Sequence, residues 1–265
     1  MTWSDATTCQ ISTRAAHRVG RMTMREHLFG WVQSGRKTLI GPHVHQHYEA
    51  GQAFILAHGT QWDVVNEPAP GGLYRALILQ FSAPLIERFH ALYGAQFAAA
   101  RPAGCARLDL TPAMRAAVQR AADGLLEADC SAALRTHRLL EVLLLLAEGG
   151  VVYAPSGAVG WDQRAGRLIA QRPQADWTLD LLAQSFHTSA STLRRRLAAC
   201  DAAFSDILRE ARMETALVLL QSTQLAVGDI AARCGYQSHS RFSAAFRQRF
   251  GFAPKQLRPA GGAAD

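Results

Sequence analysis

The feature that most constrains this chain is a pattern that occurs twice in its C-terminal part, 48 to 49 residues apart. In each copy an apolar residue and an alanine precede a serine, which is followed by apolar residues four and eight positions later. The members are Leu182-Ala183, Ser189, Leu193 and Leu197 in the first copy, and Ile230-Ala231, Ser238, Phe242 and Phe246 in the second. Alanine lets two helices cross closely, serine caps a helix N-terminus, and apolar residues four apart share one helical face. The pattern therefore predicts a helix, a turn and a second helix, twice over.

The two copies differ in the turn between their helices. The gap before the serine is one residue longer in the second copy, which places the difference in length in the turn. Gly235 stands in the second turn and can adopt a positive φ, whereas His187 stands near that place in the first. We expect this histidine to lower the stability of the first turn.

The polar face of each second helix follows from its apolar face. Helical spacing directs outward Ser191, Arg194, Arg195 and Ala198 in the first copy, and Ser240, Ser243, Ala244 and Arg247 in the second, with His239 at the exposed start. Arginine can bind guanine through two hydrogen bonds, and serine or histidine can donate to bases or phosphates. The alternative is that Arg194-Arg195-Arg196 is only a solvated basic surface. Within a duplicated helix-turn-helix, we favour a role in reading DNA.

The net charge of the chain agrees with a polyanionic partner. The formal net charge is +7 and the pI is about 9.6. From Trp161 onward there are 14 Lys and Arg against 9 Asp and Glu, so most of the excess lies in the part that contains the repeat.

Between about Trp161 and Arg258 the sequence resembles the AraC/XylS DNA-binding domain. The matching residues of the first half are Trp177-Thr178-Leu179, Leu182-Ala183, Ser189 and Leu193-x-Arg195. Those of the joining helix are Arg212-Met213-Glu214-x-Ala216-x-x-Leu219-Leu220. Those of the second half are Ile230-Ala231-x-x-Cys234-Gly235-Tyr236, Ser238, Phe242-Ser243, Phe246 and Phe250-Gly251-x-x-Pro254-x-x-Leu257-Arg258. The resemblance implies a rigid pair of reading heads that enter adjacent major-groove segments roughly 34 Å apart.

By position, the resemblance gives a base-facing set of Ser191, Arg194 and Arg195, followed by His239, Ser240 and Ala244. Lys255 and Arg258, near the end of the last helix, are expected to contact phosphates. Many relatives carry a basic residue at the position of Ala244 and an aromatic residue or histidine at that of Arg241. The second head is therefore expected to contact phosphates more, and bases less, than is usual.

The N-terminal half has a different pattern. Short apolar runs separated by Gly, Pro and Asn between residues 26 and 81 predict strands of a small barrel or sandwich, and helical patterns follow near 84–99, 111–127 and 131–148. The apolar stripe of the last of these is either internal core or a dimer interface.

The N-terminal half also resembles the cupin-like barrel with helices that senses an effector and dimerises in AraC/XylS proteins. We therefore expect a two-domain α+β protein, with an effector-binding and dimerisation domain at 1–150, a linker at 151–160, and an all-α DNA-binding domain at 161–260 whose helix-turn-helix units span about 179–200 and about 227–250.

The cellular compartment is inferred from two features. The five cysteines are scattered and form no Cys-x-x-Cys pair, which is typical of reduced thiols rather than of a disulfide framework. No apolar stretch reaches about 18 residues, and the first 20 residues lack the apolar core of a signal peptide. A cytoplasmic protein with no membrane partner is expected.

One cluster in the N-terminal half has metal-ligand chemistry. His43, His45 and His47 alternate, and Glu49 follows, as in the metal motif of catalytic cupins. Pro42 and nearby glycines indicate a loop, and the later residues of that motif are not evident. We favour exposed or hydrogen-bonded histidines over a regulatory metal site, and either over a catalytic centre, so no cofactor is expected.

The sequence thus predicts a sequence-specific DNA-binding regulator rather than an enzyme. The resemblance implies promoter DNA, RNA polymerase, a small-molecule effector and a second copy of the chain as partners, with activation as the usual outcome. Two alternatives remain open: a cupin metalloenzyme fused to a DNA-binding module, and an effector-independent dimeric DNA-binding protein.

Overall fold

The computed structural model describes residues 6–42, 44–97, 105–155 and 160–257 of the chain. The chain divides into two compact units, residues 1–157 and 158–265, and each has its own hydrophobic core. Within the described ranges, no helix is long and apolar enough to cross a membrane.

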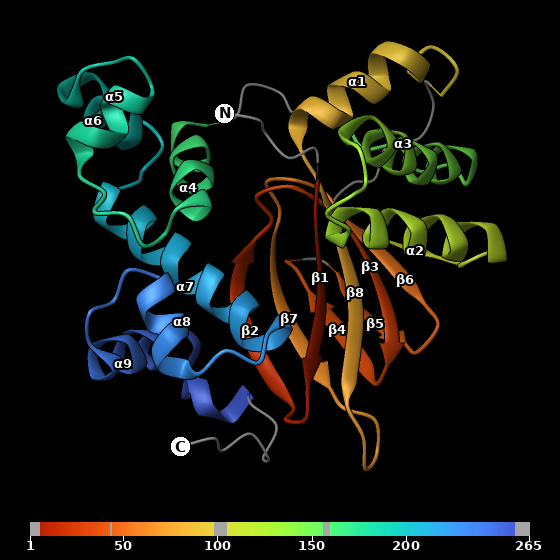
Figure 1. Cartoon of the computed structure of the whole chain (residues 1–265), viewed down its shortest axis with the longest axis horizontal. Helices are drawn as coiled ribbons and strands as arrows, with labels where there is room; N and C mark the ends of the chain where they lie inside the picture. The colour runs from red at the N-terminus through yellow and green to blue at the C-terminus, as the bar shows by residue number, and fades with distance from the viewer. Residues whose placement is uncertain (1–5, 43, 98–104, 156–159, 258–265) are drawn as a thin grey trace. The chain divides into compact units, whose positions relative to one another are not determined.

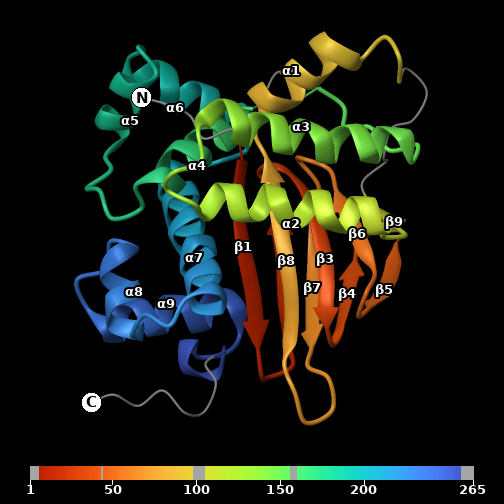
Figure 2. The ribbon, with the colours of Figure 1, turned by 45° about the vertical axis from the view of Figure 1, so that its right-hand side comes forward.

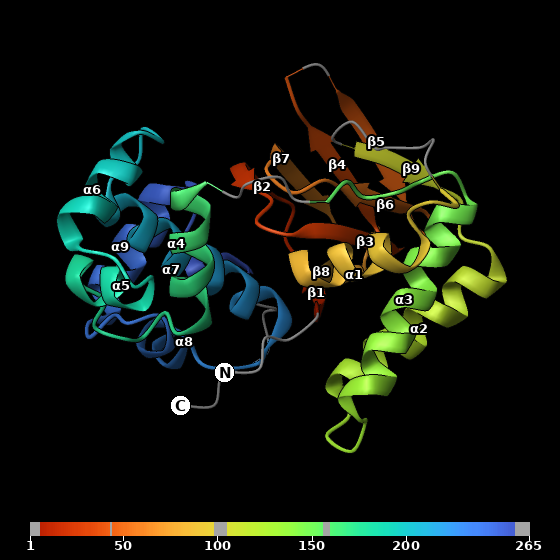
Figure 3. The ribbon, with the colours of Figure 1, turned by 90° about the horizontal axis from the view of Figure 1, so that it is seen from above.

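The first unit is built on two antiparallel sheets (Figure 1). The five-stranded sheet, in spatial order, consists of β1 (Ala6–Thr13), β8 (Tyr74–Phe81), β3 (His27–Ser34), β6 (Ala53–Leu56) and β9 (Cys105–Leu108). The four-stranded sheet consists of β2 (His17–Thr23), β7 (Gln61–Glu67), β4 (Arg36–Ile40) and β5 (His45–Glu49). Apolar side chains from both sheets form one core between them, so the two layers face each other (Figure 3).

The predicted barrel is found only in part. The antiparallel sheets are present, but among the described strands no ladder joins one sheet to the other, so the barrel is not closed. The chain passes from β1 to β2 through residues 14–16, and then β1 pairs only with β8 while β2 pairs only with β7. The edges of the two layers are therefore joined by the chain and not by hydrogen bonds between strands.

Strand β8 shows how the layers are built. Leu77, Leu79 and Phe81 lie on one face, as the period of two predicts, and they contribute to a core shared with the helices. Tyr74 and Ile78 lie on the other face, in the core between the sheets. The sequence predicts a half-buried strand, whereas β8 is buried on both faces, because the four-stranded sheet covers the face that was expected to meet solvent.

Three helices complete this core: α1 (Ala83–Tyr93), α2 (Pro112–Leu126) and α3 (Ala132–Glu148). Each begins at a hydroxyl N-cap, since the side chains of Ser82, Thr111 and Ser131 accept a hydrogen bond from the backbone N–H three residues later. Figure 2 shows α2 and α3 lying across the outer face of the five-stranded sheet. The helices predicted near 111–127 and 131–148 are confirmed to within one residue at each end, whereas the helix predicted near 84–99 ends at Tyr93, six residues early.

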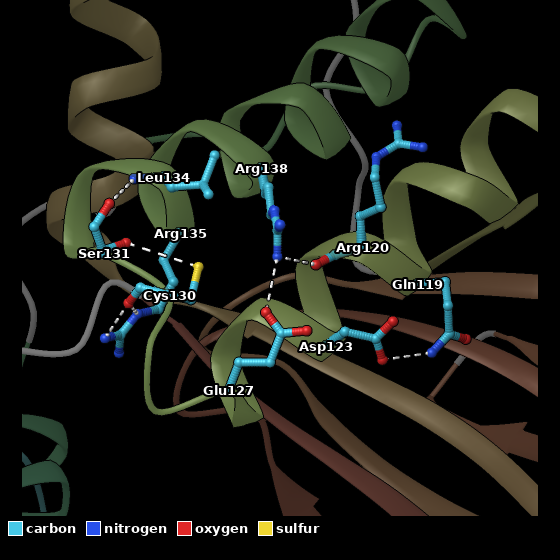
Figure 4. A network of polar contacts seen from close by, with 9 residues as sticks. All are labelled: Gln119, Arg120, Asp123, Glu127, Cys130, Ser131, Leu134, Arg135 and Arg138. Atoms are coloured by element: carbon cyan, nitrogen blue, oxygen red, sulfur yellow. Dashed lines mark hydrogen bonds and ion pairs between the residues drawn. The ribbon is translucent and has the colours of Figure 1, made fainter.

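Polar contacts join α2 and α3 at the end where the chain turns between them (Figure 4). Arg138 donates to the carbonyl of Arg120 at 3.3 Å and lies 3.6 Å from Glu127. The guanidinium of Arg135 donates twice to the carbonyl of Cys130, at 2.9 and 2.7 Å. These contacts fix the hairpin in the register that buries the apolar stripe of α3 in the core.

The predicted linker includes residues that belong to the first unit. Val152 and Tyr153 are buried in the core shared by the sheet and helices. The Tyr153 hydroxyl donates to the carbonyl of Leu28 at 2.7 Å, and the Tyr153 carbonyl is 2.7 Å from Nε2 of His90. The segment between the units therefore begins after Tyr153, because its apolar side chains anchor residues 151–153.

The second unit is helical. Its elements are α4 (Trp161–Gln171), α5 (Leu179–Ser185), α6 (Ala190–Ala198), α7 (Phe204–Ser222), α8 (Val227–Arg233), α9 (His239–Phe250) and a 3-10 turn, η1 (Pro254–Leu257). The long helix α7 runs from the α5–α6 pair to the α8–α9 pair (Figure 1). Helices α4 to α6 and the start of α7 share one core. On α9 the rings of Phe242, Phe246 and Phe250 line the buried face, with successive centroids 5.8 and 4.6 Å apart.

Candidate nucleic-acid interface

The first repeat forms a helix-turn-helix, which we call the first head (α5 and α6). Leu182 and Ala183 are buried on α5, and Leu193 and Leu197 are buried on α6. Ser189 caps α6, since its Oγ accepts from the Thr192 N–H at 3.2 Å. The predicted roles of these residues in the fold are confirmed.

The second repeat, the second head (α8 and α9), is built in the same way. Ile230 and Ala231 are buried on α8, and Phe242 and Phe246 are buried on α9. Ser238 caps α9 by accepting from the Arg241 N–H at 3.4 Å. The two heads therefore share a local design, as their spacing predicts.

The turns of the two heads close with equivalent hydrogen bonds. Thr188 N–H donates to the Ala183 carbonyl at 3.0 Å, and Tyr236 N–H donates to the Ala231 carbonyl at 2.9 Å. The residue before each donor is left-handed, with φ of +52° at His187 and +77° at Gly235. One residue separates His187 from its N-cap and two separate Gly235 from its own, so the extra residue of the second copy lies after the left-handed position.

The side chains predicted to face DNA in the first head are exposed. Ser191, Arg194 and Arg195 are all solvent-exposed on α6, on the face opposite Leu193 and Leu197. No hydrogen bond or ion pair within the described residues engages the guanidinium of Arg194 or Arg195. Both cations are thus available to an external anion.

Arg196 behaves differently from its two neighbours. Its guanidinium carbon lies 4.1 Å from the ring centroid of Trp161, and that of Arg164 lies 4.2 Å from the same centroid. Trp161 also contacts Phe186 edge-on, at 5.5 Å between ring centroids. Stacking on the aromatic face holds Arg196 against α4. Sequence periodicity does not reveal this contact, because the residues come from different helices.

In the second head, His239, Ser240 and Arg247 are exposed, while Ser243 is half-buried. Arg249 turns the other way: its Nε lies 2.8 and 2.7 Å from the carboxylate oxygens of Glu210 on α7. Arg241 and Arg247 remain exposed on α9, so the second recognition helix also presents arginines to an external anion.

The two predicted phosphate contacts lie at the end of the second unit. Lys255 is exposed in η1, which is anchored by buried Pro254 and Leu257. Arg258 lies outside the described residues.

The histidine cluster of the first unit is only partly described. His43 is outside the described residues, and His45 and His47 are exposed on β5 with ring centroids 4.8 Å apart. His47 Nδ1 is 2.8 Å from Thr38 Oγ1, and Glu49 pairs with Arg36 at 2.6 Å. No group of three or more potential metal ligands occurs in the part of the chain that the structure describes.

A buried lysine in the first unit was not identified from the sequence. Lys37 lies on β4 between the sheets, and its Nζ donates to Asn66 Oδ1 at 2.9 Å. The same nitrogen lies 5.3 Å from the ring centroid of Phe54 and 5.6 Å from that of Tyr74. Burial lowers the pKa of Lys37 to about 7, and no carboxylate among the described residues forms an ion pair with it. In the sequence, its burial is indicated by Leu39 two residues later, because alternate residues of a strand point to the same face and Leu39 is a core residue.

The hydroxyl of Tyr74 is a second uncompensated polar group in this interior. Tyr74 is fully buried, and its hydroxyl has no hydrogen-bond partner within the described ranges. Burial also raises the pKa of this phenol, which keeps it protonated and able to donate. Lys37 and Tyr74 thus place a cationic and a neutral donor in one apolar interior.

Comparisons with known proteins identify the second unit. Residues 182–260 match the family model described as a helix-turn-helix domain. The chain is 36% identical over 97 residues to the urease operon transcriptional activator of Escherichia coli, covering 37% of this chain and 33% of that protein. It is 30% identical over 131 residues to the HTH-type transcriptional regulator YdeO of Escherichia coli strain K12, covering 46% and 51%. The chain thus spans between a third and a half of the curated relatives that it matches.

A solved structure of ToxT from Vibrio cholerae, with an unsaturated fatty acid bound, has the same overall fold. It superposes with a TM-score of 0.61 and covers 100% of both chains at 12% sequence identity. At this identity the likeness concerns the fold alone. Together with the two heads and the joining helix, the matched sequences show that residues 182–260 form a helix-turn-helix domain whose relatives are regulators of the AraC/XylS family.

Proposed function

We propose that this protein is a transcriptional regulator that binds double-stranded promoter DNA through its second unit. The carrying observation is the pair of equivalent heads, each presenting exposed polar side chains on the helix opposite its buried face. An α-helix fits the major groove, where side chains can distinguish base pairs. The excess of positive charge in this part of the chain supports the same partner.

The proposed contacts fall into two groups. The residues assigned to bases and adjacent phosphates are Ser191, Arg194, Arg195, His239, Ser240, Ser243 and Arg247. Lys255 and Arg258 are assigned to phosphates. Arg194 and Arg195 are expected to contribute most, because they are exposed cations on the helix that enters the groove.

Selection from a random DNA library with the full chain tests this function. The protein should enrich a defined motif, and its affinity should fall steeply as salt rises from about 50 to 200 mM, because bound cations displace phosphate counterions. Replacing Arg194 and Arg195 together by alanine should abolish enrichment, whereas Arg75→Ala, at an exposed arginine of the first unit, should not. Failure of the wild-type protein to enrich any motif would exclude the proposal.

We further infer that the first unit binds an apolar carboxylic acid as effector. The support is the interior that holds Lys37 with Asn66 but no carboxylate as its partner, and Tyr74 with an unpaired hydroxyl, among a cluster of buried apolar side chains. A bound carboxylate would supply the missing negative charge and acceptor. ToxT, which shares this fold, was solved with an unsaturated fatty acid bound. Entry of such a ligand requires the packing around Lys37 to open.

Thermal unfolding with oleate as the probe tests the effector proposal. Oleate should raise the melting temperature of the wild-type protein by mass action, and oleyl alcohol, which lacks the charge, should not. The shift should be lost in Lys37→Met and reduced in Tyr74→Phe. Equal shifts in wild type and Lys37→Met would contradict the assignment.

The proposal extends to the compartment, the oligomeric state and the mode of regulation. The protein would act as a cytoplasmic homodimer, with residues 1–153 sensing and dimerising and residues 161–260 binding DNA, and would activate transcription by contact with RNA polymerase. Transcription reconstituted from purified polymerase and a promoter bearing the selected motif tests activation, and sedimentation tests the dimer. Turnover of a small acid by metal-loaded protein would instead favour the metalloenzyme alternative.

A further inference from the structure

Arg212 lies in the middle of α7, where the two halves of the second unit meet. Its Nε donates to the carbonyl of Pro173 at 2.9 Å, and one terminal nitrogen donates to the carbonyl of Ala175 at 3.0 Å. Both acceptors belong to the segment between α4 and α5, directly before the first head. A side chain of the joining helix thus holds the backbone that leads into the first head.

The same guanidinium touches the turn of the second head. A Cβ placed on Gly235 would lie 2.6 Å from a terminal nitrogen of Arg212 and 2.8 Å from the Pro173 carbonyl oxygen. These separations are too short for a side chain, so the turn can lie against Arg212 only because residue 235 is glycine. The left-handed φ of +77° at Gly235 favours the same residue. One guanidinium therefore contacts the segment that leads into the first head and the turn of the second head.

The shape of arginine matters at this junction. Its planar fork donates in two fixed directions, whereas a lysine ammonium is a single point with no fixed orientation. In the described residues Arg212 forms no ion pair, and both of its acceptors are neutral carbonyls. The contact therefore specifies geometry more than it neutralises charge. A second anchor, Glu210 with Arg249, joins α7 to the recognition helix of the second head.

We propose that Arg212 is a positioning residue that sets the relative placement of the two heads and thereby selects the spacing between the two DNA segments they read. This inference rests on the proposed DNA-binding function. Adding one base pair between two segments moves them apart by about 3.4 Å and rotates them by about a tenth of a turn. Only a rigid pair of heads discriminates against such a change. Arg212 supplies that rigidity because it contacts the approach to one head and the turn of the other.

The test uses the full chain and the motif selected by the wild-type protein. Affinities are measured for DNA in which the two segments are separated by the selected spacing, and by one base pair more or less. The wild-type protein should lose at least about tenfold in affinity when the spacing changes. Arg212→Lys and Arg212→Gln should lose less than about threefold, while the base preference within each segment is unchanged. Arg209→Ala is the matched control, since it removes an exposed arginine of α7 whose ion-pair partner within the described residues is Asp206.

The outcomes separate this inference from the proposed function. If the wild-type protein selects no motif, DNA binding itself fails. If it selects a motif and the folded Arg212 variants discriminate spacing as sharply as the wild type does, the inference is wrong although the function stands. Loss of folding in both variants would also overturn it, because Arg212 would then determine stability and not spacing. If Arg209→Ala relaxes the spacing preference as much as the Arg212 variants do, the effect comes from the loss of positive charge on α7 and the inference is also wrong.

Discussion

Single residues on α6 are exposed to different degrees, and their roles should differ accordingly. Arg195 is exposed and unengaged, whereas Arg196 is stacked on Trp161. An arginine that binds a base edge contributes to the choice of sequence, while a phosphate contact strengthens binding to every sequence. The position of a cation on the fold therefore predicts which property of DNA binding it controls.

We expect Arg195→Ala to weaken binding to the selected motif by about 1–3 kcal/mol and to relax the preference at one base position. Lys255→Ala, which removes a proposed phosphate contact, should weaken all sequences about equally and reduce the salt dependence. Repeating the library selection with each variant distinguishes the two effects. If both variants returned the wild-type motif, the assignment of Arg195 to a base would be incorrect.

Lys37 should make the stability of the protein depend on pH in a defined direction. Its pKa is about 7 in the folded protein and 10.5 in the reference state. Between these values the unfolded chain binds the extra proton, so the free energy of unfolding should rise as the pH increases from about 7 to 10.5. Below pH 7 both states are charged, and the full cost of the buried charge, on the order of several kcal/mol, is present.

Urea unfolding of the wild-type protein and Lys37→Met at pH 6, 8 and 10 measures this effect. The variant should be the more stable at pH 6, and its advantage should shrink as the pH rises. Cys9 and His17 are titratable groups that lie close to Lys37. Because the wild type and the variant both contain them, the comparison isolates the contribution of the lysine. Parallel pH profiles would show that Lys37 does not carry the buried charge.

At the scale of the element, the two turns offer a natural comparison, because one position is left-handed with histidine and the other with glycine. A left-handed conformation costs a non-glycine residue about 1–2 kcal/mol, part of which glycine offsets through the entropy of the unfolded chain. We therefore expect His187→Gly to raise the melting temperature of the protein by a few degrees. Thr188→Gly, at the next turn position with ordinary φ, should lower it, and calorimetry of both variants checks the contrast.

The elements of the second unit could be predicted from the sequence because their signals are local. Serine caps, apolar residues four apart and a small residue at the crossing all lie within a few turns of one another, and the structure confirms the two heads. The exposure of Arg194 and Arg195 could be predicted from their helical spacing relative to the buried apolar face. The stacking of Arg196 on Trp161 could not be predicted, since it depends on how α4 packs against α6.

In the first unit the decisive information is long-range. The burial of Lys37 depends on its neighbours in the register, Tyr48 on β5 and Asn66 on β7, and on rings from the opposite sheet. The start of the predicted linker, at residue 151, lies inside the first unit for the same reason, because the hydroxyl of Tyr153 donates to the carbonyl of Leu28, 125 residues away. Strand alternation indicates which residues share a face but not what covers that face.

For the whole molecule, we expect protein purified without a histidine tag to carry no stoichiometric transition metal. Two of the three described candidate ligands already have polar partners in the protein, since His47 contacts Thr38 and Glu49 pairs with Arg36. Ligands that are not oriented by further contacts bind metals weakly. Elemental analysis measures the content, and replacement of His43, His45 and His47 together by alanine should leave regulation of a reporter promoter unchanged. One metal per chain, lost with regulation in the triple variant, would make the protein a metal sensor.

The two heads share a frame but carry different side chains, with adjacent exposed arginines at 194 and 195 on α6, and His239, Ser240, Arg241 and Arg247 exposed on α9. They also differ by one residue in the turn that leads into the recognition helix. A single chain cannot therefore read the same sequence when it is turned end for end on the duplex. Its site would have an intrinsic polarity, and a bound molecule would present one fixed side toward the start of the gene. Inverting such a site in a promoter would change what the protein does there without changing how tightly it binds.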